Sequence, residues 1–179
     1  MKKMSGAARL AVAAMATALG VLFMFAASAI PAGKLALCFL ASLVIWIPLN
    51  ERGGLGPALL CYLATAALVF LIVPNKVYFG AYCLLFGLYG FIKLGVDTVI
   101  EDRLIAFVVK VIIMNALCVL GLFIASRVLG QNALSMLPEY PLYLVIPLLE
   151  IAFIAYELLY SFCIKVFDER LRDIITPRR

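Results

Sequence analysis

The sequence predicts an all-α membrane protein with six transmembrane helices and both termini in the cytoplasm. Hydrophobic residues make up 66% of the 179 residues and charged residues only 14%, a balance typical of a chain whose solvent is lipid. The apolar residues fall into six long runs separated by short polar segments. Since ~20 helical residues cross the ~30 Å hydrocarbon layer, each run is interpreted as a helix that spans, or nearly spans, the membrane.

We expect a single domain over residues 1–179, with spans at about residues 8–30, 35–49, 55–73, 77–94, 104–126 and 141–166. The first run follows basic residues, as a secretory signal does. It is longer than a signal core and a second apolar run follows at once, so we interpret it as a transmembrane helix. The polar stretch 93–103 is expected to be a solvated loop or short surface helix, and residues 128–140 form the longest connection.

The distribution of basic residues predicts the orientation. With the amino terminus inside, the cytoplasmic side carries Lys2, Lys3, Arg9, Arg52, Lys93, Arg103, Lys165, Arg170, Arg172, Arg178 and Arg179, and the opposite side carries Lys34, Lys76 and Arg127. Because cytoplasmic loops hold the excess of Lys and Arg, both termini are expected in the cytoplasm, with the chain in the bacterial inner (cytoplasmic) membrane and in contact with lipid.

Composition also excludes several classes of function. There is no histidine, so Ser-His-Asp and Cys-His pairs and HExxH zinc sites are excluded. The five cysteines lie in different apolar runs without CxxC spacing, and we expect free thiols, no metal and no cofactor. No Walker A sequence occurs. The scattered basic residues indicate topology rather than nucleic-acid binding, and we expect no enzyme activity.

The last apolar run carries two carboxylates, Glu150 and Glu157. Seven residues are almost two helical turns, so both lie on one face, with Tyr143 above and Tyr160 below. Carboxylates at this depth cost a few kcal/mol each if they face lipid, which predicts that this face points into the protein or a cavity. It is the main candidate for a functional surface.

The fifth run contains Lys110 in its inner half and Asn115 near its middle. We expect Lys110 and Glu157 to form a structural ion pair, which leaves Glu150, at a depth close to that of Asn115, facing a space nearer the outside. Lys110 could instead extend to the inner surface, and the roles of the two acids could be reversed. The candidate substrate-binding residues are Glu150, Asn115, Tyr82, Tyr143 and Glu157.

Small residues mark two helix faces. Ala7, Ala11, Ala14 and Ala18 follow spacings of four, three and four, which places them on one face of the first helix. Such a face permits close approach of another helix, either from a partner subunit or from within the protein. In the fourth run, Gly80, Cys83, Gly87 and Gly90 indicate close packing, with a ligand site as the alternative.

These features together resemble the substrate-binding S component of energy-coupling factor (ECF) vitamin transporters. The resemblance rests on six helices, a basic start, the alanine stripe of the AxxxA kind and the longer outer segment before the sixth helix. It implies a passive subunit that binds a small-molecule solute in the outer half of the membrane, and partners comprising a scaffold membrane subunit, contacted through the alanine stripe, and two ATPase subunits. A buried acid beside tyrosines would suit a cationic or amine-bearing ring compound.

Other classes of function remain open at the level of sequence. The chain could be a small bacterial membrane accessory or assembly protein in which Glu150 and Glu157 only fix helix packing. It could also be an autonomous channel, carrier or intramembrane enzyme. An acid catalyst would need two convergent carboxylates, whereas these are ~10 Å apart along one helix.

Overall fold

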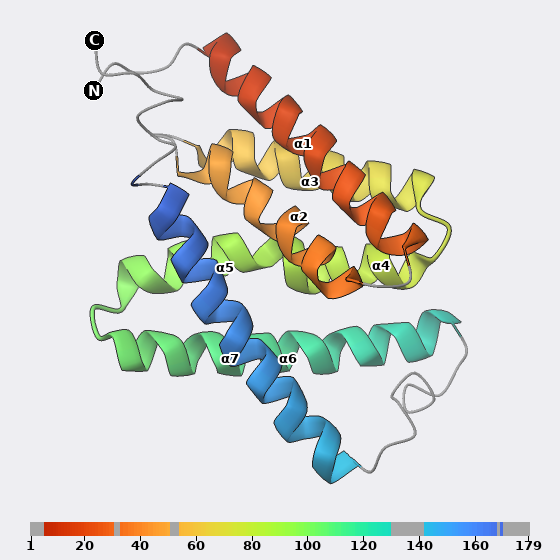
Figure 1. The fold of residues 1–179 in the computed structure, drawn as a ribbon, viewed down its shortest axis with the longest axis vertical. Coiled ribbons are helices and arrows are strands. Elements are labelled where there is room, and N and C mark those ends of the chain that lie inside the picture. Colours follow the sequence, from red (N-terminus) through yellow and green to blue (C-terminus); the bar gives the residue numbers. More distant parts are fainter. Residues whose placement is uncertain (1–5, 31–32, 51–53, 130–141, 168, 170–179) are drawn as a thin grey trace. The chain divides into compact units, whose positions relative to one another are not determined.

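A computed structural model describes residues 6–30, 33–50, 54–129, 142–167 and 169 of the chain. The helices are α1 (Gly6–Ala29), α2 (Lys34–Leu49), α3 (Leu55–Ile72), α4 (Lys76–Ala81), the π-helical turn η1 (Tyr82–Phe86), α5 (Gly87–Val99), α6 (Arg103–Leu129) and α7 (Leu142–Val166) (Figure 1). No strand occurs in these ranges. The predicted all-helical class is therefore confirmed.

Four of the described helices are long and apolar enough to cross a membrane: Gly6–Ala29, Leu55–Ile72, Lys76–Val99 and Arg103–Ile124. The apolar helix Lys34–Leu49 is shorter. These helices indicate a membrane protein. The number of spans and the side on which the termini lie stay predictions.

Two helix ends differ from the expected ones. The fourth helix, formed by α4, η1 and α5 without a break, continues to Val99 rather than ending at Leu94. The polar stretch after Lys93 is therefore helical over its first half, and its acidic residue Asp97 lies on α5. Helix α6 begins at Arg103 and ends at Leu129, three residues beyond the expected end.

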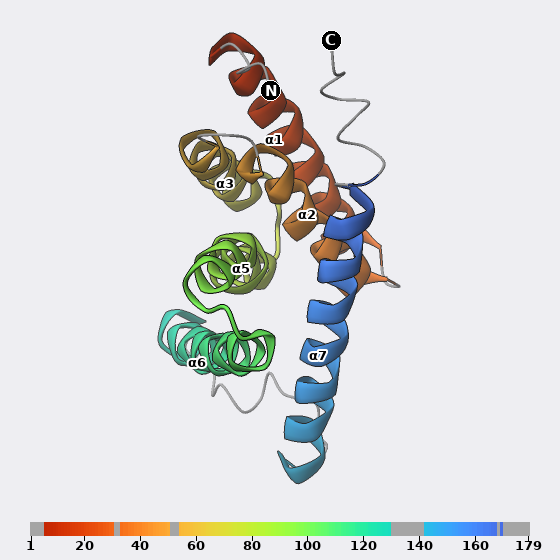
Figure 2. The same cartoon turned by 90° about the vertical axis from the view of Figure 1, so that its left-hand side faces the viewer.

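Internal contacts divide the chain into two units, each described by itself. The larger unit, Met4–Met136, contains α1 to α6, and the smaller unit, Leu137–Arg179 with Met1–Lys3, contains α7. Within the larger unit α2 is central, since it contacts α1, α3, α5 and η1. Helix α5 in turn contacts α6, and Figure 2 shows α5 between α6 and the α1–α3 group.

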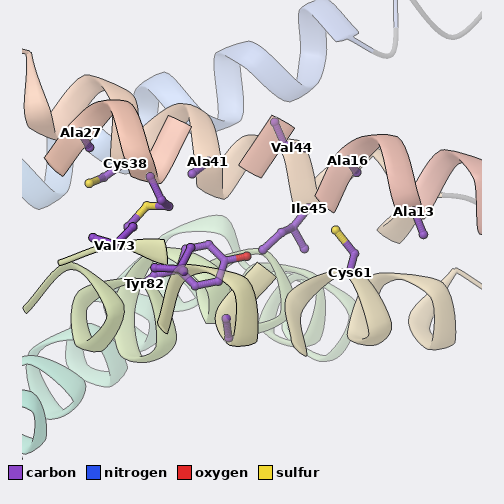
Figure 3. Packing of buried hydrophobic residues seen from close by; sticks show 13 residues of the cluster. Ala13, Ala16, Ala27, Cys38, Ala41, Val44, Ile45, Cys61, Val73 and Tyr82 are labelled. Carbon is purple, nitrogen blue, oxygen red and sulfur yellow. The ribbon is translucent and has the colours of Figure 1, made fainter. Parts of the chain in front are cut away.

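The core of the larger unit lies where α1, α2, α3 and η1 meet (Figure 3). Its members are mostly small: Ala13, Ala16, Met24, Ala27, Cys38, Ala41, Val44, Ile45, Cys61, Ala66, Val69, Val73 and Tyr82. Small side chains let helix backbones approach closely, which is how membrane helices gain packing energy when lipid is as apolar as the core. Tyr82 is the one large aromatic member of this described cluster.

Polar groups close the turn between α3 and α4, which sets where the fourth helix begins. The Asn75 side chain accepts a hydrogen bond from the Val77 amide at 3.0 Å, capping the first turn of α4. The Lys76 ammonium group donates to the carbonyl oxygens of Phe70 and Val73 at the end of α3. The Phe70 carbonyl in the last turn of α3 and the Val73 carbonyl just after it thus gain a donor, as carbonyls left over at a helix end require.

Candidate functional site

The fourth helix contains a π-helical turn, Tyr82–Phe86, in which the Gly87 amide bonds to the Tyr82 carbonyl five residues back. A π turn inserts one residue into an α-helix, and such turns are frequent at functional sites. The Tyr62 hydroxyl of α3 donates a 2.9 Å hydrogen bond to the Cys83 carbonyl oxygen within this turn. A side chain from another helix therefore takes part in the hydrogen bonding of the widened backbone.

Packing around the π turn is tight. The rings of Tyr62 and Tyr82 stack with centroids 6.0 Å apart and planes inclined by 22°, and Phe91 meets Tyr62 edge-on at 6.1 Å. Gly87 lies beneath the Tyr62 ring: a Cβ there would be 2.6 Å from Tyr62 Cε2 and 2.9 Å from the Tyr82 carbonyl oxygen. The glycine is therefore required for the contact between α3 and the fourth helix.

The turn directs Tyr82 into the core, where the residue is fully buried. In Figure 3 its hydroxyl points to the side on which Ile45 and Cys61 lie. The Thr65 hydroxyl is nearby, but neither hydroxyl makes a hydrogen bond of acceptable geometry. Tyr82 is one of the residues that the sequence predicts as a solute contact. The structure places it among packed helices, and its role as a contact stays a prediction.

A charged triad lies where α5 and α6 pack together. Asp97 Oδ1 is 2.9 Å from Lys110 Nζ, and Asp97 Oδ2 is 3.5 Å from Lys93 Nζ. The two lysine side chains are only 8% and 5% exposed, whereas that of Asp97 is 43% exposed. Two ammonium groups thus share one carboxylate at the rim of the helix pair. The two nearly buried lysines thus meet a carboxylate that keeps partial contact with solvent.

This triad supplies a partner for Lys110 that the sequence did not reveal, because the sequence predicts Asp97 in a solvated loop or short surface helix rather than on the fourth helix. Pairing of Lys110 with Glu157 would join the two units and stays a prediction. Asn115 is exposed on α6, and its Nδ2 donates to the Val111 carbonyl oxygen at 3.1 Å. The amide of Asn115 is therefore at least partly satisfied by its own helix.

Helix α7 carries the two acids and, beside them, a row of aromatic rings. Phe153 and Tyr156 stack with centroids 6.2 Å apart, and Tyr156 and Tyr160 with centroids 5.8 Å apart. Glu157 and Tyr160 are buried, Glu150 is half-buried, and Ser161 donates to Glu157 Oε1 at 3.4 Å. The acids and the aromatic row share one half of the helix, since spacings of three, four and seven residues return to the same side.

The other predicted positions differ in how far the structure describes them. All four members of the alanine stripe on α1, Ala7, Ala11, Ala14 and Ala18, are exposed. The buried small residues of α1 are others, namely Ala13, Ala16, Gly20 and Ala27. The side chain of Tyr143 and the segment 130–140 lie outside the described residues. Whether Glu150, Asn115 and Tyr82 meet in one site depends on how the two units are placed, and this stays a prediction.

The sequence does not predict a role for Thr65 and Tyr62, although both lie next to Tyr82 in space. Their only sequence signal is that they are polar residues inside the apolar run 55–72, a feature many membrane helices share. Among the described residues, no group of three or more His, Cys, Asp or Glu could hold a metal ion.

Comparisons of the chain with protein-family models, with curated proteins and with solved structures find no match.

Proposed function

We propose that this chain is the substrate-binding membrane subunit of an ECF-type micronutrient importer, with six spans, both termini in the cytoplasm, and capture of a small solute from the outer side. In this proposal the chain has no catalytic centre and works with a scaffold membrane subunit and two ATPase subunits. The observation that carries it is an apolar helical chain whose first helix leaves its alanine stripe unpacked.

The alanine stripe supports the partner part of the proposal. Its four residues are exposed, whereas other small residues of the same helix, Ala13, Ala16, Gly20 and Ala27, are buried. If the stripe existed for packing against α2 or α3, it would be buried with them. A smooth exposed face of this kind allows another helix to approach closely, which is the interaction that holds membrane subunits together.

The acid face of α7 supports the solute part of the proposal. A carboxylate within an apolar segment is costly unless it meets a charge or polar group, and the row Phe153, Tyr156 and Tyr160 lies on the same side. Aromatic faces attract cations. The negative charges of Glu150 and Glu157 would attract a solute with a cationic or amine-bearing ring, and the ring could stack on this row, which is why we propose that class.

Co-purification tests the partner part. An affinity-tagged chain should co-purify with a membrane scaffold and two ATPases when expressed in its own host. Replacing Ala11 by Trp should reduce the recovered complex about tenfold or more, equivalent to ~1.4 kcal/mol, because the side chain holds the helices apart. Ala67→Trp, at an exposed alanine on α3, is the matched control and should leave recovery unchanged. Equal loss in both variants, or no ATPase in the wild-type eluate, would contradict the proposal.

One alternative has an observation in its favour. Glu157 is buried and accepts a hydrogen bond from Ser161 of its own helix, as a residue with a purely structural role would. In a membrane accessory or assembly protein the acids would fix helix packing and bind no solute. Native mass spectrometry of the purified chain separates the two functions, because a retained small molecule is expected only for the importer subunit.

A further inference from the structure

Two hydroxyl groups in the core of the larger unit lack hydrogen-bond partners. Thr65 of α3 is 1% exposed and Tyr82 of η1 is 0% exposed, and neither Thr65 Oγ1 nor Tyr82 Oη has a bond of acceptable geometry. Thr65 lies in the helix Leu55–Ile72 and Tyr82 in the helix Lys76–Val99, and both helices are long and apolar enough to cross a membrane. Neither hydroxyl can therefore turn outward to bulk water.

Other polar groups surround this pair. The Cys61 thiol of α3 adjoins both Thr65 and Thr17, and Thr17 is itself buried on α1. The Thr17 hydroxyl donates to the Ala13 carbonyl oxygen at 2.8 Å. Its donor is thereby used, whereas its oxygen can still accept a bond. Two free donors, one further acceptor and a weak thiol donor thus converge from three helices.

The backbone holds these groups in place. A Cβ on Gly20 of α1 would lie 3.2 Å from Thr65 Cγ2 and 3.4 Å from Thr65 Oγ1, so α1 closes directly over the threonine. The Tyr62 bond to the π turn fixes the backbone from which Tyr82 extends. These contacts hold α1, α3 and the fourth helix close together around the two hydroxyls.

A buried hydroxyl without a partner is destabilising, because it loses its bonds to water and gains none in return. A direct bond between the two would use one donor and leave the other. Proteins commonly resolve such a deficit with an internal water, on average about one per 27 residues, that makes about three hydrogen bonds to groups of this kind.

We propose that Thr65 and Tyr82 form a binding site for one internal water molecule, with Thr17 and Cys61 as further partners. The water accepts from one hydroxyl and donates to the remaining oxygens, so it satisfies both groups and links α1, α3 and the fourth helix. The site takes a small, uncharged hydrogen-bonding molecule because the four named side chains are neutral hydroxyls and a thiol. It does not depend on the transport proposal.

Oxygen-17 magnetic relaxation dispersion of the purified protein in detergent tests the site, because it counts water molecules held longer than bulk exchange allows. The signal should fall by one water equivalent in Tyr82→Phe and in Thr65→Val. It should be retained in Thr65→Ser, which keeps the hydroxyl, and in Tyr78→Phe, which removes a half-buried hydroxyl from the same helix. A signal unchanged in both Tyr82→Phe and Thr65→Val would overturn the proposal.

A double-mutant cycle gives a second readout that needs only folded protein. Each single variant leaves the other hydroxyl without its bridge, whereas the double variant removes both. The unfolding equilibrium constant is measured by titration with a denaturing detergent. In the double variant it should be about fivefold smaller than the value obtained by multiplying the effects of the two single variants. Simple multiplication of the two effects would contradict a shared molecule, even if one variant were too unstable for the relaxation measurement.

Discussion

At the scale of single residues, the charged triad gives an asymmetric prediction. Asp97→Asn removes the carboxylate that Lys93 and Lys110 share, whereas Lys110→Met leaves Asp97 with Lys93. We expect Asp97→Asn to be the more destabilising change, on the order of 2 kcal/mol, which is below the ~3–5 kcal/mol of a fully buried pair because Asp97 is partly exposed.

Thermal unfolding in detergent measures the difference between these variants. Glu101→Gln, at an exposed acid in the loop after α5, is the control and should leave the midpoint unchanged. If Lys110→Met lowered the unfolding midpoint more than Asp97→Asn, this result would contradict the proposal that two lysines depend on the one carboxylate of Asp97.

Two glycines of the fourth helix give opposite predictions. Gly87→Ala should destabilise by about 1–3 kcal/mol, since its Cβ would collide with the Tyr62 ring and the Tyr82 carbonyl. Gly80→Ala meets nothing within 4 Å and should be neutral or stabilising by up to about 1 kcal/mol, because alanine favours a helix. The two unfolding midpoints, measured side by side, check the packing at the π turn. Equal shifts would contradict it.

At the scale of elements, the π turn depends on a neighbouring helix. Tyr62→Phe deletes the hydroxyl that bonds to the Cys83 carbonyl while keeping the ring stack on Tyr82. We expect a loss of about 1–2 kcal/mol and faster hydrogen exchange at the amides of residues 82–87, because the widened backbone loses its external donor. Tyr78→Phe serves as the control, and exchange that is equally slow in both variants would show that the turn needs no support from α3.

The helices could be predicted from the sequence because apolar runs of the right length have few other solutions in lipid. The end of the fourth helix could not. The charged residues after Lys93 are typical of a loop. In the structure, however, Asp97 lies one helical turn beyond Lys93 and pairs with both Lys93 and Lys110, and this pairing stabilises the helix beyond Leu94. A π turn leaves no pattern in the sequence, and the meeting of Thr65 with Tyr82 depends on helix rotations that hydrophobic periodicity does not define.

The candidate site was predictable only in part. That Glu150 and Glu157 share a face of α7 follows from their spacing alone. The exposure of the alanine stripe on α1 could not be derived, because Ala13 and Ala16 occur in the same run and form an equally small face. Composition identifies small residues but does not say which of two adjacent faces the neighbouring helices cover.

At the scale of the whole molecule, the proposed orientation can be tested by labelling. All native cysteines of the described structure lie within helices, with Cys38 and Cys61 buried. In a background with these replaced by alanine or serine, Lys76→Cys should react with a membrane-impermeant maleimide on intact cells. Glu101→Cys should react only after lysis, because the positive-inside rule puts it in the cytoplasm. The opposite labelling pattern would invert the topology and with it the outward-facing solute site.

Solute capture gives the last prediction. Glu150→Gln should weaken binding of a cationic solute by about tenfold or more, since it removes the attracting charge while keeping shape, equivalent to ~1.4 kcal/mol. Equilibrium binding of the molecule retained by the wild type provides the measurement. Glu169→Gln, at an exposed position beyond the end of α7, is the matched control. Undiminished binding in Glu150→Gln would exclude this acid as the contact.

The short central helix α2 has a consequence for how the protein is made. Its 16 residues extend only ~24 Å, and its buried residues face α1, α3 and α5 rather than lipid. While the ribosome is still producing the later helices, α2 emerges before most of these neighbours exist. We therefore expect α1 and α2 to leave the insertion machinery together as a hairpin, and α2 to reach its final depth only once α3 and α5 have been synthesised.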